Sequence, residues 1–315
     1  MYDLIALGEL LIDFAPQEEA WVYKANPGGA PANVAVAAAK LGLRTAFVGK
    51  VGRDAFGQLL YRTLKDEGVD PSGLVMTDEA PTTLAFVTLD PQGDREFTFY
   101  RRHSADTLLR VEDINEAMFR DLKVFHCGSL SLTHDNARAA TLKALEAARA
   151  AGARISYDPN YRALLWDNEE QAIEAMKSLL PLTDILKISE EELALITREK
   201  TLGKGLEALK AYGIEIIVVT RGAAGAVLLH EGRVIPVAPF RVTAVDTTGA
   251  GDAFMGALLY QLIAVRPARL EEAVTFANAA GALCATGSGA IPSLGKKEDI
   301  EKILAGSPGL EPGAK

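Results

Sequence analysis

A short glycine-containing stretch ahead of an apolar helix carries the residues best suited to chemistry. From Asp246 to Phe254 the sequence reads DTTGAGDAF, and the run Met255–Ile263 that follows is helical in character. Glycine lacks the Cβ atom that keeps a backbone away from an anion, and the first N–H groups of a helix point outward unpaired. Asp252 would lie in that first turn, where a carboxylate can accept a proton from a hydroxyl that attacks phosphorus. The alternative is a plain helix cap, with Asp252 favourable only to the helix dipole.

A second pair of glycines precedes the first predicted helix. Gly28 and Gly29 would let bare backbone lie against a ligand, and Asn33 would offer a donor and an acceptor suited to a sugar hydroxyl. Such a stretch can also be an ordinary turn. The spacing favours a site, because Gly42 closes the predicted helix and Gly52 closes the next predicted strand.

The elements that must position these residues alternate along the chain. Short apolar runs alternate with segments of helical period, which is typical of an α/β protein with a mainly parallel sheet. The predicted strands are Asp3–Leu7, Thr45–Val51, Val124–Cys127, Arg154–Asp158, Asp184–Lys187 and Ile216–Thr220, with a hairpin of Ala226–Leu229 and Val234–Val237. The predicted helices include Pro31–Leu41, Phe56–Glu67, Asn136–Ala151, Gln171–Leu180 and Glu271–Thr286.

Two stretches without partner helices interrupt this alternation. Phe14–Lys24 predicts a short polar strand, and Thr82–Leu89 and Glu96–Arg101 alternate on either side of a turn at Asp90–Gly93. They indicate a small β-lid, formed by about residues 14–25 and 82–102, over one end of the sheet. Because the chain shows no internal repeat or linker, we expect residues 1–315 to form a single domain, with residues 306–315 as a flexible tail.

The composition narrows the class of protein. The 315 residues are 49% hydrophobic and 24% charged, which is ordinary for a globular protein, and a net charge of −9 argues against a nucleic-acid partner. No apolar run approaches the roughly 20 residues that span a bilayer, and the start lacks the basic region of a signal peptide. With Cys127 and Cys284 read as reduced core residues, we expect a cytoplasmic protein without a membrane partner. P-loop, dinucleotide-binding and zinc-binding motifs are absent from the sequence.

The two glycine-containing regions together resemble the signature regions of the ribokinase-like (PfkB) carbohydrate kinases, and the resemblance covers essentially the whole chain. It implies a three-layer α/β/α fold with an inserted β-lid, ATP and Mg²⁺ as co-substrates, and a homodimer formed through the lid. By this resemblance Asp252 is the catalytic base, and Gly249, Ala250 and Gly251 form an anion hole. Asp13, which follows the first strand in the sequence GELLID, would bind the sugar together with Gly28, Gly29 and Asn33.

Within that family, three further stretches are most similar to fructokinases. The first is Phe99–Arg101, followed by Ser104-Ala105-Asp106. The second is Asp158–Arg162, followed by Leu165-Trp166, and the third is Lys187–Glu191. The resemblance makes Tyr100, Arg101 and Arg162 candidate sugar contacts, since Arg101 would end a lid strand and Arg162 would follow the end of an inner strand. The alternatives are an ordinary turn at Asp158–Asn160 and solvated surface charges for the two arginines.

The residues expected to bind the nucleotide are inferred from the same resemblance. Many family members carry an Asn-x-x-Glu motif associated with Mg²⁺ and phosphate, whereas this chain has Lys187-Ile188-Ser189-Glu190. Glu190 would then orient a metal-bound water, and Lys187 would neutralise a phosphate directly. The turn with Thr220, Gly222 and Gly225 and the helix residue Asn278 resemble the family's nucleotide-side positions. A monovalent-cation site, for K⁺, would combine Asp246, Thr248, Cys284, Gly287, Gly289 and Ser293.

These expectations lead to a kinase that phosphorylates fructose, at the 6-hydroxyl. The nearest alternative is a kinase for a keto-sugar acid such as 2-keto-3-deoxygluconate, in which Arg101 and Arg162 would pair with a carboxylate. An alternative of another class is a non-catalytic sugar- or nucleotide-binding protein on the same fold. A nucleoside kinase would need more aromatic stacking surface near the sugar site than the sequence offers.

Overall fold

The computed structural model describes residues 1–19, 21–89 and 95–306. Its central sheet has nine strands in the order β13-β12-β11-β10-β9-β8-β1-β4-β5, parallel except at β12 and β13. The strands are β1 (Leu4–Leu7), β4 (Thr45–Gly52), β5 (Val69–Thr77), β8 (Val124–Cys127), β9 (Arg154–Tyr157), β10 (Ile185–Ser189), β11 (Ile216–Thr220), β12 (Ala226–His230) and β13 (Arg233–Val237). β1, β4 and β8 are buried along their whole length, as strands of a parallel sheet covered on both faces must be.

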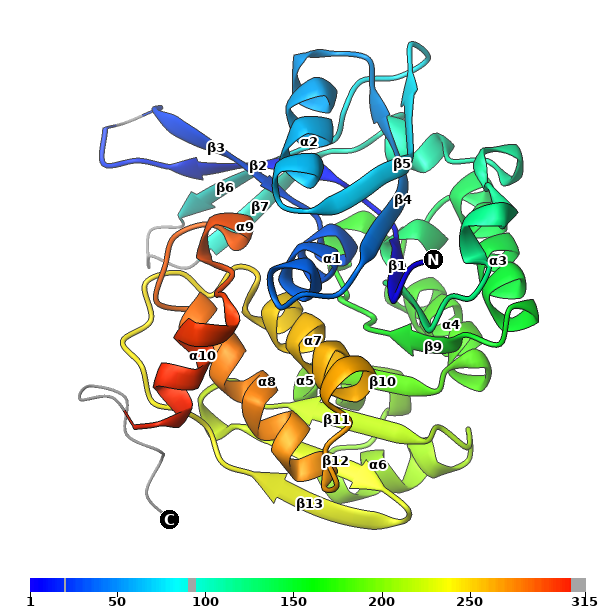
Figure 1. The fold of residues 1–315 in the computed structure, drawn as a ribbon. Helices are drawn as coiled ribbons and strands as arrows, with labels where there is room; N and C mark the ends of the chain where they lie inside the picture. Colours follow the sequence, from blue (N-terminus) through cyan, green and yellow to red (C-terminus); the bar gives the residue numbers. More distant parts are fainter. Residues whose placement is uncertain (20, 90–94, 307–315) are drawn as a thin grey trace.

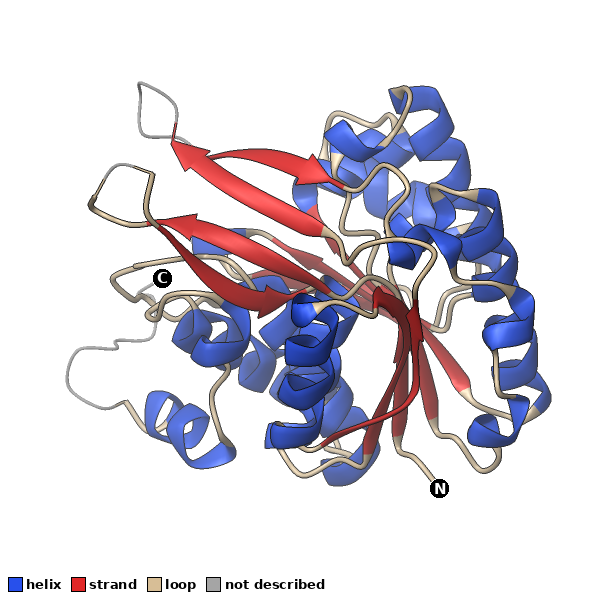
Figure 2. Ribbon diagram, turned by 90° about the horizontal axis from the view of Figure 1, so that it is seen from above, coloured by secondary structure: helices blue, strands red, loops and turns tan. Residues whose placement is uncertain are grey.

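Helices cover both faces of this sheet, giving three layers (Figures 1 and 2). Alternate residues of β1 separate the two cores: Ile5 and Leu7 pack with α3, α4, α5 and α6, whereas Leu4 packs with α1, α7, α8 and α10. The helices are α1 (Ala30–Lys40), α2 (Ala55–Asp66), α3 (Asp135–Ala150), α4 (Glu169–Leu179), α5 (Glu190–Thr197), α6 (Leu202–Lys210), α7 (Ala250–Tyr260), α8 (Leu270–Cys284), α9 (Ala290–Ser293) and α10 (Lys297–Leu304). A π-helical turn, Gln261–Val265, continues α7.

A second sheet of four strands projects from one end of the central sheet (Figure 2). Its order is β3-β2-β6-β7, with β2 (Leu11–Pro16), β3 (Tyr23–Gly28), β6 (Leu84–Leu89) and β7 (Arg95–Tyr100). It is the β-lid that the sequence indicates, with one correction: the region around Phe14–Lys24 is a two-stranded hairpin, not a single strand. The three-layer fold with an inserted lid is therefore confirmed.

Most predicted elements are present with ends shifted by one or two residues. β5 was missed because Asp70, Pro71, Ser72 and Gly73 give its first half the composition of a turn, and its register with β4 shifts between Ala46 and Val48. Helices α5, α6, α9 and α10 were also not predicted. The predicted turn at Asp90–Gly93 and, apart from Gly306, the predicted tail lie outside the described residues. None of the helices in the described part of the chain is long and apolar enough to cross a bilayer.

Candidate active site

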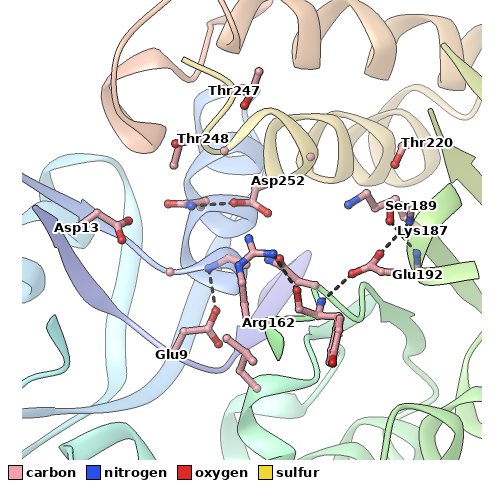
Figure 3. Close-up of a pocket in the computed structure, with 18 of the residues that line it drawn as sticks. Glu9, Asp13, Arg162, Lys187, Ser189, Glu192, Thr220, Thr247, Thr248 and Asp252 are labelled. Carbon is pink, nitrogen blue, oxygen red and sulfur yellow. Dashed lines mark hydrogen bonds between the residues drawn. The ribbon is translucent and has the colours of Figure 1, made fainter. Parts of the chain in front are cut away.

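A cavity of about 760 Å³ opens beneath the lid at the carboxyl ends of the central strands (Figure 3). Open α/β sheets bind ligands at this edge, because the strand ends and the following loops converge there. Of the residues predicted from the sequence, those that line the cavity are Asp13, Gly29, Asn33, Arg162, Lys187, Thr220, Thr248, Gly249, Gly251 and Asp252. Segments that are distant in the sequence, at residues 9–33 and 247–252, thus meet in one space.

Asp252 lies in the first turn of α7 with its side chain held in one orientation. Gly249 caps the helix in the left-handed region, with φ of 82°, which a glycine adopts without strain. The side-chain Nδ2 of Asn33 donates to Oδ2 of Asp252 at 2.8 Å. Burial raises the pKa of Asp252, against the opposing effects of this hydrogen bond, Lys187 and Arg162. Since Asn33 occupies one oxygen, the other carboxylate oxygen is free to act on a substrate hydroxyl.

The start of α7 forms a surface on which an anion can lie. A Cβ atom added to Gly251 would stand 2.9 Å from Nζ of Lys187, so a larger residue here would push this ammonium group away from the start of the helix. Ala250, the third predicted member of the anion hole, has its N–H donated to the carbonyl of Thr247 at 3.2 Å and does not line the cavity. Of the three residues predicted for the anion hole, Gly249 and Gly251 therefore line the cavity, with Lys187 beside Gly251, and Ala250 does not.

Lys187 forms a buried ion pair. Its Nζ donates to Oδ2 of Asp158 at 2.7 Å, and the two residues are 7% and 3% exposed. Burial opposes the charged form of Lys187, but the carboxylates of Asp158, Glu192 and Asp252 raise its pKa overall. Burial raises the pKa of Asp158 to about 7, even though Lys187 acts in the opposite direction. The raised pKa of Lys187 keeps its ammonium group charged beside Asp158.

The opposite end of the cavity carries Asp13, from β2. Burial raises the pKa of its carboxyl to about 7, against the opposing charge of Arg162. Gly28 does not line the cavity, but a Cβ atom there would collide with Oδ2 of Asp13, so this glycine makes room for the carboxylate. Figure 3 shows Asp13 and Asp252 to either side of α1, with Arg162 below and between them in the view.

Two predicted sugar contacts are not at the cavity. Arg101 is 3% exposed, and its guanidinium donates to Oδ2 of Asp106 at 2.7 Å, to Oγ1 of Thr133 at 2.8 Å and to the carbonyl of Leu130 at 2.9 Å. These contacts make Arg101 a structural residue. Tyr100 is 63% exposed and packs its ring on Phe86, with the centroids 5.6 Å apart, on the other face of the lid.

The side chain of β7 that does reach the cavity is Phe99. Neighbouring residues of a strand face opposite sides of the sheet, so Phe99 and Tyr100 cannot both face the sugar. The sequence alone did not say which residue of this stretch points inward. Arg162 does line the cavity, and its Nη1 donates to the carbonyl of Tyr161 at 3.1 Å.

The predicted metal-orienting residue, Glu190, also requires correction. Its Oε2 accepts from Nε of Arg221 at 2.9 Å, and it does not line the cavity. Glu191 and Glu192 line it instead. Glu192 accepts from the N–H of Tyr161 at 2.7 Å and from the N–H of Ser189 at 2.9 Å, because Ser189 and Glu192 form a capping box at the start of α5. The acid at the cavity is therefore Glu192, three residues after Ser189. It is not Glu190, which comes three residues after Lys187.

The predicted nucleotide-side residues divide into two groups. Thr220, at the end of β11, lines the cavity. Gly222, Gly225 and Asn278 do not. Gly225 packs where a Cβ atom would collide with the carbonyl of Val237, and Nδ2 of Asn278 donates to the carbonyl of Ala238 at 3.0 Å. These residues shape the loop beside the cavity.

The residues predicted for a monovalent cation are brought together. Asp246 accepts from the N–H of Thr248 at 2.8 Å and from the N–H of Gly289 at 3.0 Å, so it ties the loop before α7 to the loop after α8. The Sγ of Cys284 lies 3.7 Å from the carbonyl of Thr248. The Oγ of Ser293 occupies the space where a side chain on Gly287 would stand. Asp246, Thr248 and Cys284 thus link the loop that leads into α7 with the end of α8 and the loop after it.

Comparison with known proteins now identifies the family. The profile of the pfkB family carbohydrate kinases matches residues 1–297. This chain belongs to that family. The kinase is similar to fructokinase-1 of Oryza sativa subsp. japonica, which is 43% identical over 314 residues, covering 96% of this chain and 97% of that protein.

Solved structures agree with this assignment. Fructokinase from Xylella fastidiosa with bound ATP superposes on the kinase with a TM-score of 0.89 at 34% identity, covering 97% of this chain and 99% of that one. A double mutant of fructokinase from Vibrio cholerae in its fructose-, ADP- and potassium-bound form gives a TM-score of 0.89 at 36% identity, covering 96% and 97%. The resemblance to PfkB carbohydrate kinases, and to fructokinases within them, is thus confirmed.

Of the acids that line the kinase's cavity, Glu9, Glu191 and Glu192 were not predicted as site residues, and neither was Asp158 beside them. Glu9 accepts from the N–H of Ala30 at 3.0 Å, and burial raises its pKa to about 7. Asp158 pairs with Lys187, and Glu192 organises the start of α5. Asp158 comes directly after the buried strand β9 and Glu9 comes two residues after β1, at the edge where parallel strands place their ligands. That position was the signal from which both could have been identified.

Proposed function

We propose that this kinase transfers the γ-phosphoryl group of ATP to the 6-hydroxyl of fructose. The observation that carries the proposal is a single cavity in which the Asp252 carboxylate, held by Asn33, adjoins the glycines at the start of α7 and shares the space with Asp13. Fructokinases are among its relatives, and one was solved with fructose and ADP bound.

Each end of the cavity has its own task in this reaction. Asp13 and the backbone at Gly29 bind sugar hydroxyls, so that the 6-hydroxyl lies beside Asp252, which accepts its proton during attack on phosphorus. The N–H group of Gly251 and the Lys187 ammonium offset negative charge on the transferred group. Positioning and charge neutralisation then supply most of the rate gain, as in phosphoryl transfer generally.

ATP would enter along Lys187, Thr220 and the start of α7, and Mg²⁺ would accompany its phosphates. Mg²⁺ keeps several waters and takes few protein ligands, so a carboxylate that orients metal-bound water suits it. Glu191 and Glu192 are the acids that line this part of the cavity. Gly222, Gly225 and Asn278 would support the nucleotide loop from outside.

The test is an ADP-release screen with fructose, glucose, ribose, 2-keto-3-deoxygluconate and adenosine. We expect fructose to give the highest kcat/KM. A preference of about tenfold for the keto-sugar acid, equal to about 1.4 kcal/mol, would overturn fructose as the substrate. That alternative relies on two arginines at the substrate, and Arg101 is committed to Asp106 elsewhere. Turnover with none of the five would favour a non-catalytic binding protein.

Potassium should activate the kinase through the Asp246 cluster. The carbonyl oxygens of the two loops that Asp246 joins are the hard ligands that K⁺ takes, and an ion there would fix the backbone that leads into Gly249. Replacing potassium with tetramethylammonium at constant ionic strength should lower kcat/KM by about tenfold, the scale of one charge-assisted contact. Unchanged kcat and KM would remove this cation from the proposal.

The lid should hold two kinase chains together as a homodimer. Its outer face carries Phe14, Tyr23, Phe86 and Tyr100, whose rings contact one another around Phe86. A small sheet with an aromatic outer face favours a partner. We expect a dimeric mass by light scattering at micromolar concentration and a monomeric mass for Tyr100→Asp. Val234→Asp, at a 51% exposed position on β13, is the matched control that should stay dimeric. A monomeric wild-type protein would contradict the proposal.

We also place the kinase in the cytoplasm, with sugar and ATP as its small-molecule partners. Cys127 and Cys284 are both buried and unpaired, which suits a reducing compartment. Intracellular ATP is the co-substrate that the proposed reaction requires.

A further inference from the structure

The buried pair of Asp158 and Lys187 does more than its contribution to stability explains. Tyr157 and Leu186 are register partners in the neighbouring parallel strands β9 and β10, so the next residue of each strand brings Asp158 and Lys187 together at the cavity edge. Taking two charges out of water costs more than an ion pair commonly returns, and apolar residues of similar volume are often as stable. Oδ1 of Asp158 increases that cost, since it is buried without a hydrogen-bond partner among the described residues.

The ammonium group of the pair lies where phosphoryl charge would pass. Its nitrogen is 2.9 Å from the position of a Cβ atom on Gly251, which places it against the first turn of α7. Figure 3 shows the Lys187 side chain turned toward that turn, with Ser189 and Glu192 beside it. A lysine stem is flexible, so this position depends on the group that holds the ammonium.

Asp252 and Glu192 compete with Asp158 for the same ammonium group, because all three carboxylates act on Lys187. If Lys187 moved to Asp252, it would occupy the oxygen that must take the proton of the sugar hydroxyl. Its contact with Asp158 prevents this, and keeps the cation on the phosphate side of the base.

We propose that Asp158 is a positioning residue for phosphoryl transfer, which fixes the Lys187 ammonium against the start of α7 and away from Asp252. The inference rests on the proposed kinase activity and adds to it. Asp158 itself takes no proton and touches no substrate. Its effect on the reaction passes entirely through Lys187.

The experiment compares Asp158→Asn, Lys187→Gln and the double variant in the full chain. For Asp158→Asn we expect kcat/KM for ATP to fall about 10- to 100-fold, the scale of one hydrogen bond to a charged group. KM for fructose should stay within about twofold of the wild-type value. AMP should bind as in wild type. A non-hydrolysable ATP analogue should bind more weakly, since Lys187 acts on the terminal phosphate. In the Lys187→Gln background, Asp158→Asn should change kcat/KM by less than about twofold, because residues that act as a unit are not additive.

The matched control is Asp184→Asn, at the other end of the same two strands, where Oδ2 accepts from the N–H of Ile155 at 2.7 Å. It should lower the melting temperature and leave kcat/KM near wild type. Should Asp158→Asn fail to fold, Asp158→Glu keeps the charge but displaces the ammonium, and it should still lose about tenfold in kcat/KM.

Three results would overturn the proposal. Near wild-type kinetics in a folded Asp158→Asn or Asp158→Glu would show a purely structural pair. Additive losses in the double variant would show a role of Asp158 that does not pass through Lys187. A return of kcat/KM toward the wild-type value in Asp158→Asn at raised Mg²⁺ concentration would show that Asp158 acts on the metal. In each case the wild-type protein still turns over, whereas failure of the proposed function shows as a wild type that releases no ADP with any sugar.

Discussion

Asp252→Asn should lower kcat by about 10²–10⁴-fold, or about 3–5 kcal/mol of barrier, the usual cost of losing a general base. The amide is nearly isosteric with the carboxylate and still suits the first turn of α7. It cannot accept the proton of the attacking hydroxyl. Because that contribution exists only in the transition state, the affinities for fructose and ATP should change little.

Steady-state kinetics, calorimetric binding and the melting temperature of the purified variant test this expectation together. Asn33 donates to Oδ2 of Asp252, and the variant can keep this contact through its amide oxygen. If Asp252 only capped the helix, the variant would lose some stability and retain near-normal turnover in its folded fraction. A well-folded Asp252→Asn with wild-type kcat would therefore remove Asp252 as the base.

Asp13→Ala should abolish most recognition of the sugar while it stabilises the empty protein. Two hydrogen bonds from sugar hydroxyls to a carboxylate are worth about 10²–10⁴ in kcat/KM for fructose, and KM for ATP should remain within about twofold. Burial raises the pKa of Asp13 to about 7 in the folded protein. A carboxyl whose pKa is raised by folding binds a proton more tightly in the folded state, so its contribution to stability is full at low pH and is lost as pH rises toward 7.

The melting temperatures of wild type and Asp13→Ala, followed from pH 4 to pH 8, separate these effects. The free energy of unfolding of Asp13→Ala should exceed that of wild type by an amount that grows from about pH 4 to about pH 7. The difference should then level off at an order of a few kcal/mol. Saturating fructose should raise the melting temperature of wild type only. A variant that keeps wild-type kcat/KM for fructose would show that Asp13 does not contact the sugar, whatever its melting temperature.

Sequence reasoning was most accurate where one short segment fixes its own geometry. Gly249, with φ of 82°, allows the tight entry into α7 that the glycine pattern indicates, so Asp252 was predicted in the first turn and was found there. It was least accurate where the direction of a side chain depends on a distant partner. Arg101 faces away from the cavity because Asp106 and Thr133 hold it, and neither contact can be read from the stretch around Arg101 alone.

The position of Glu190 outside the cavity lining was missed for a related reason. The motif was aligned on Lys187, whereas the capping box that starts α5 is formed by Ser189 and Glu192. A capping box has its own sequence signature, Ser followed three residues later by Glu, and this signature was present. The pairing of Lys187 with Asp158, by contrast, depends on which strands are neighbours, and composition and periodicity do not determine this order.

The hydrogen bond from Asn33 to Asp252 joins residues that are 219 positions apart in the chain. During synthesis, the ribosome therefore completes α1 long before it makes the helix that carries the base. Until α7 emerges, the side of α1 that carries Val34 and Ala38 has no helix to cover it, since these residues pack in the same core as Phe254 and Leu258. A nascent chain that stalls before residue 250 thus offers an apolar surface to chaperones and lacks Asp252, and the cavity is completed only after most of the sequence has been translated.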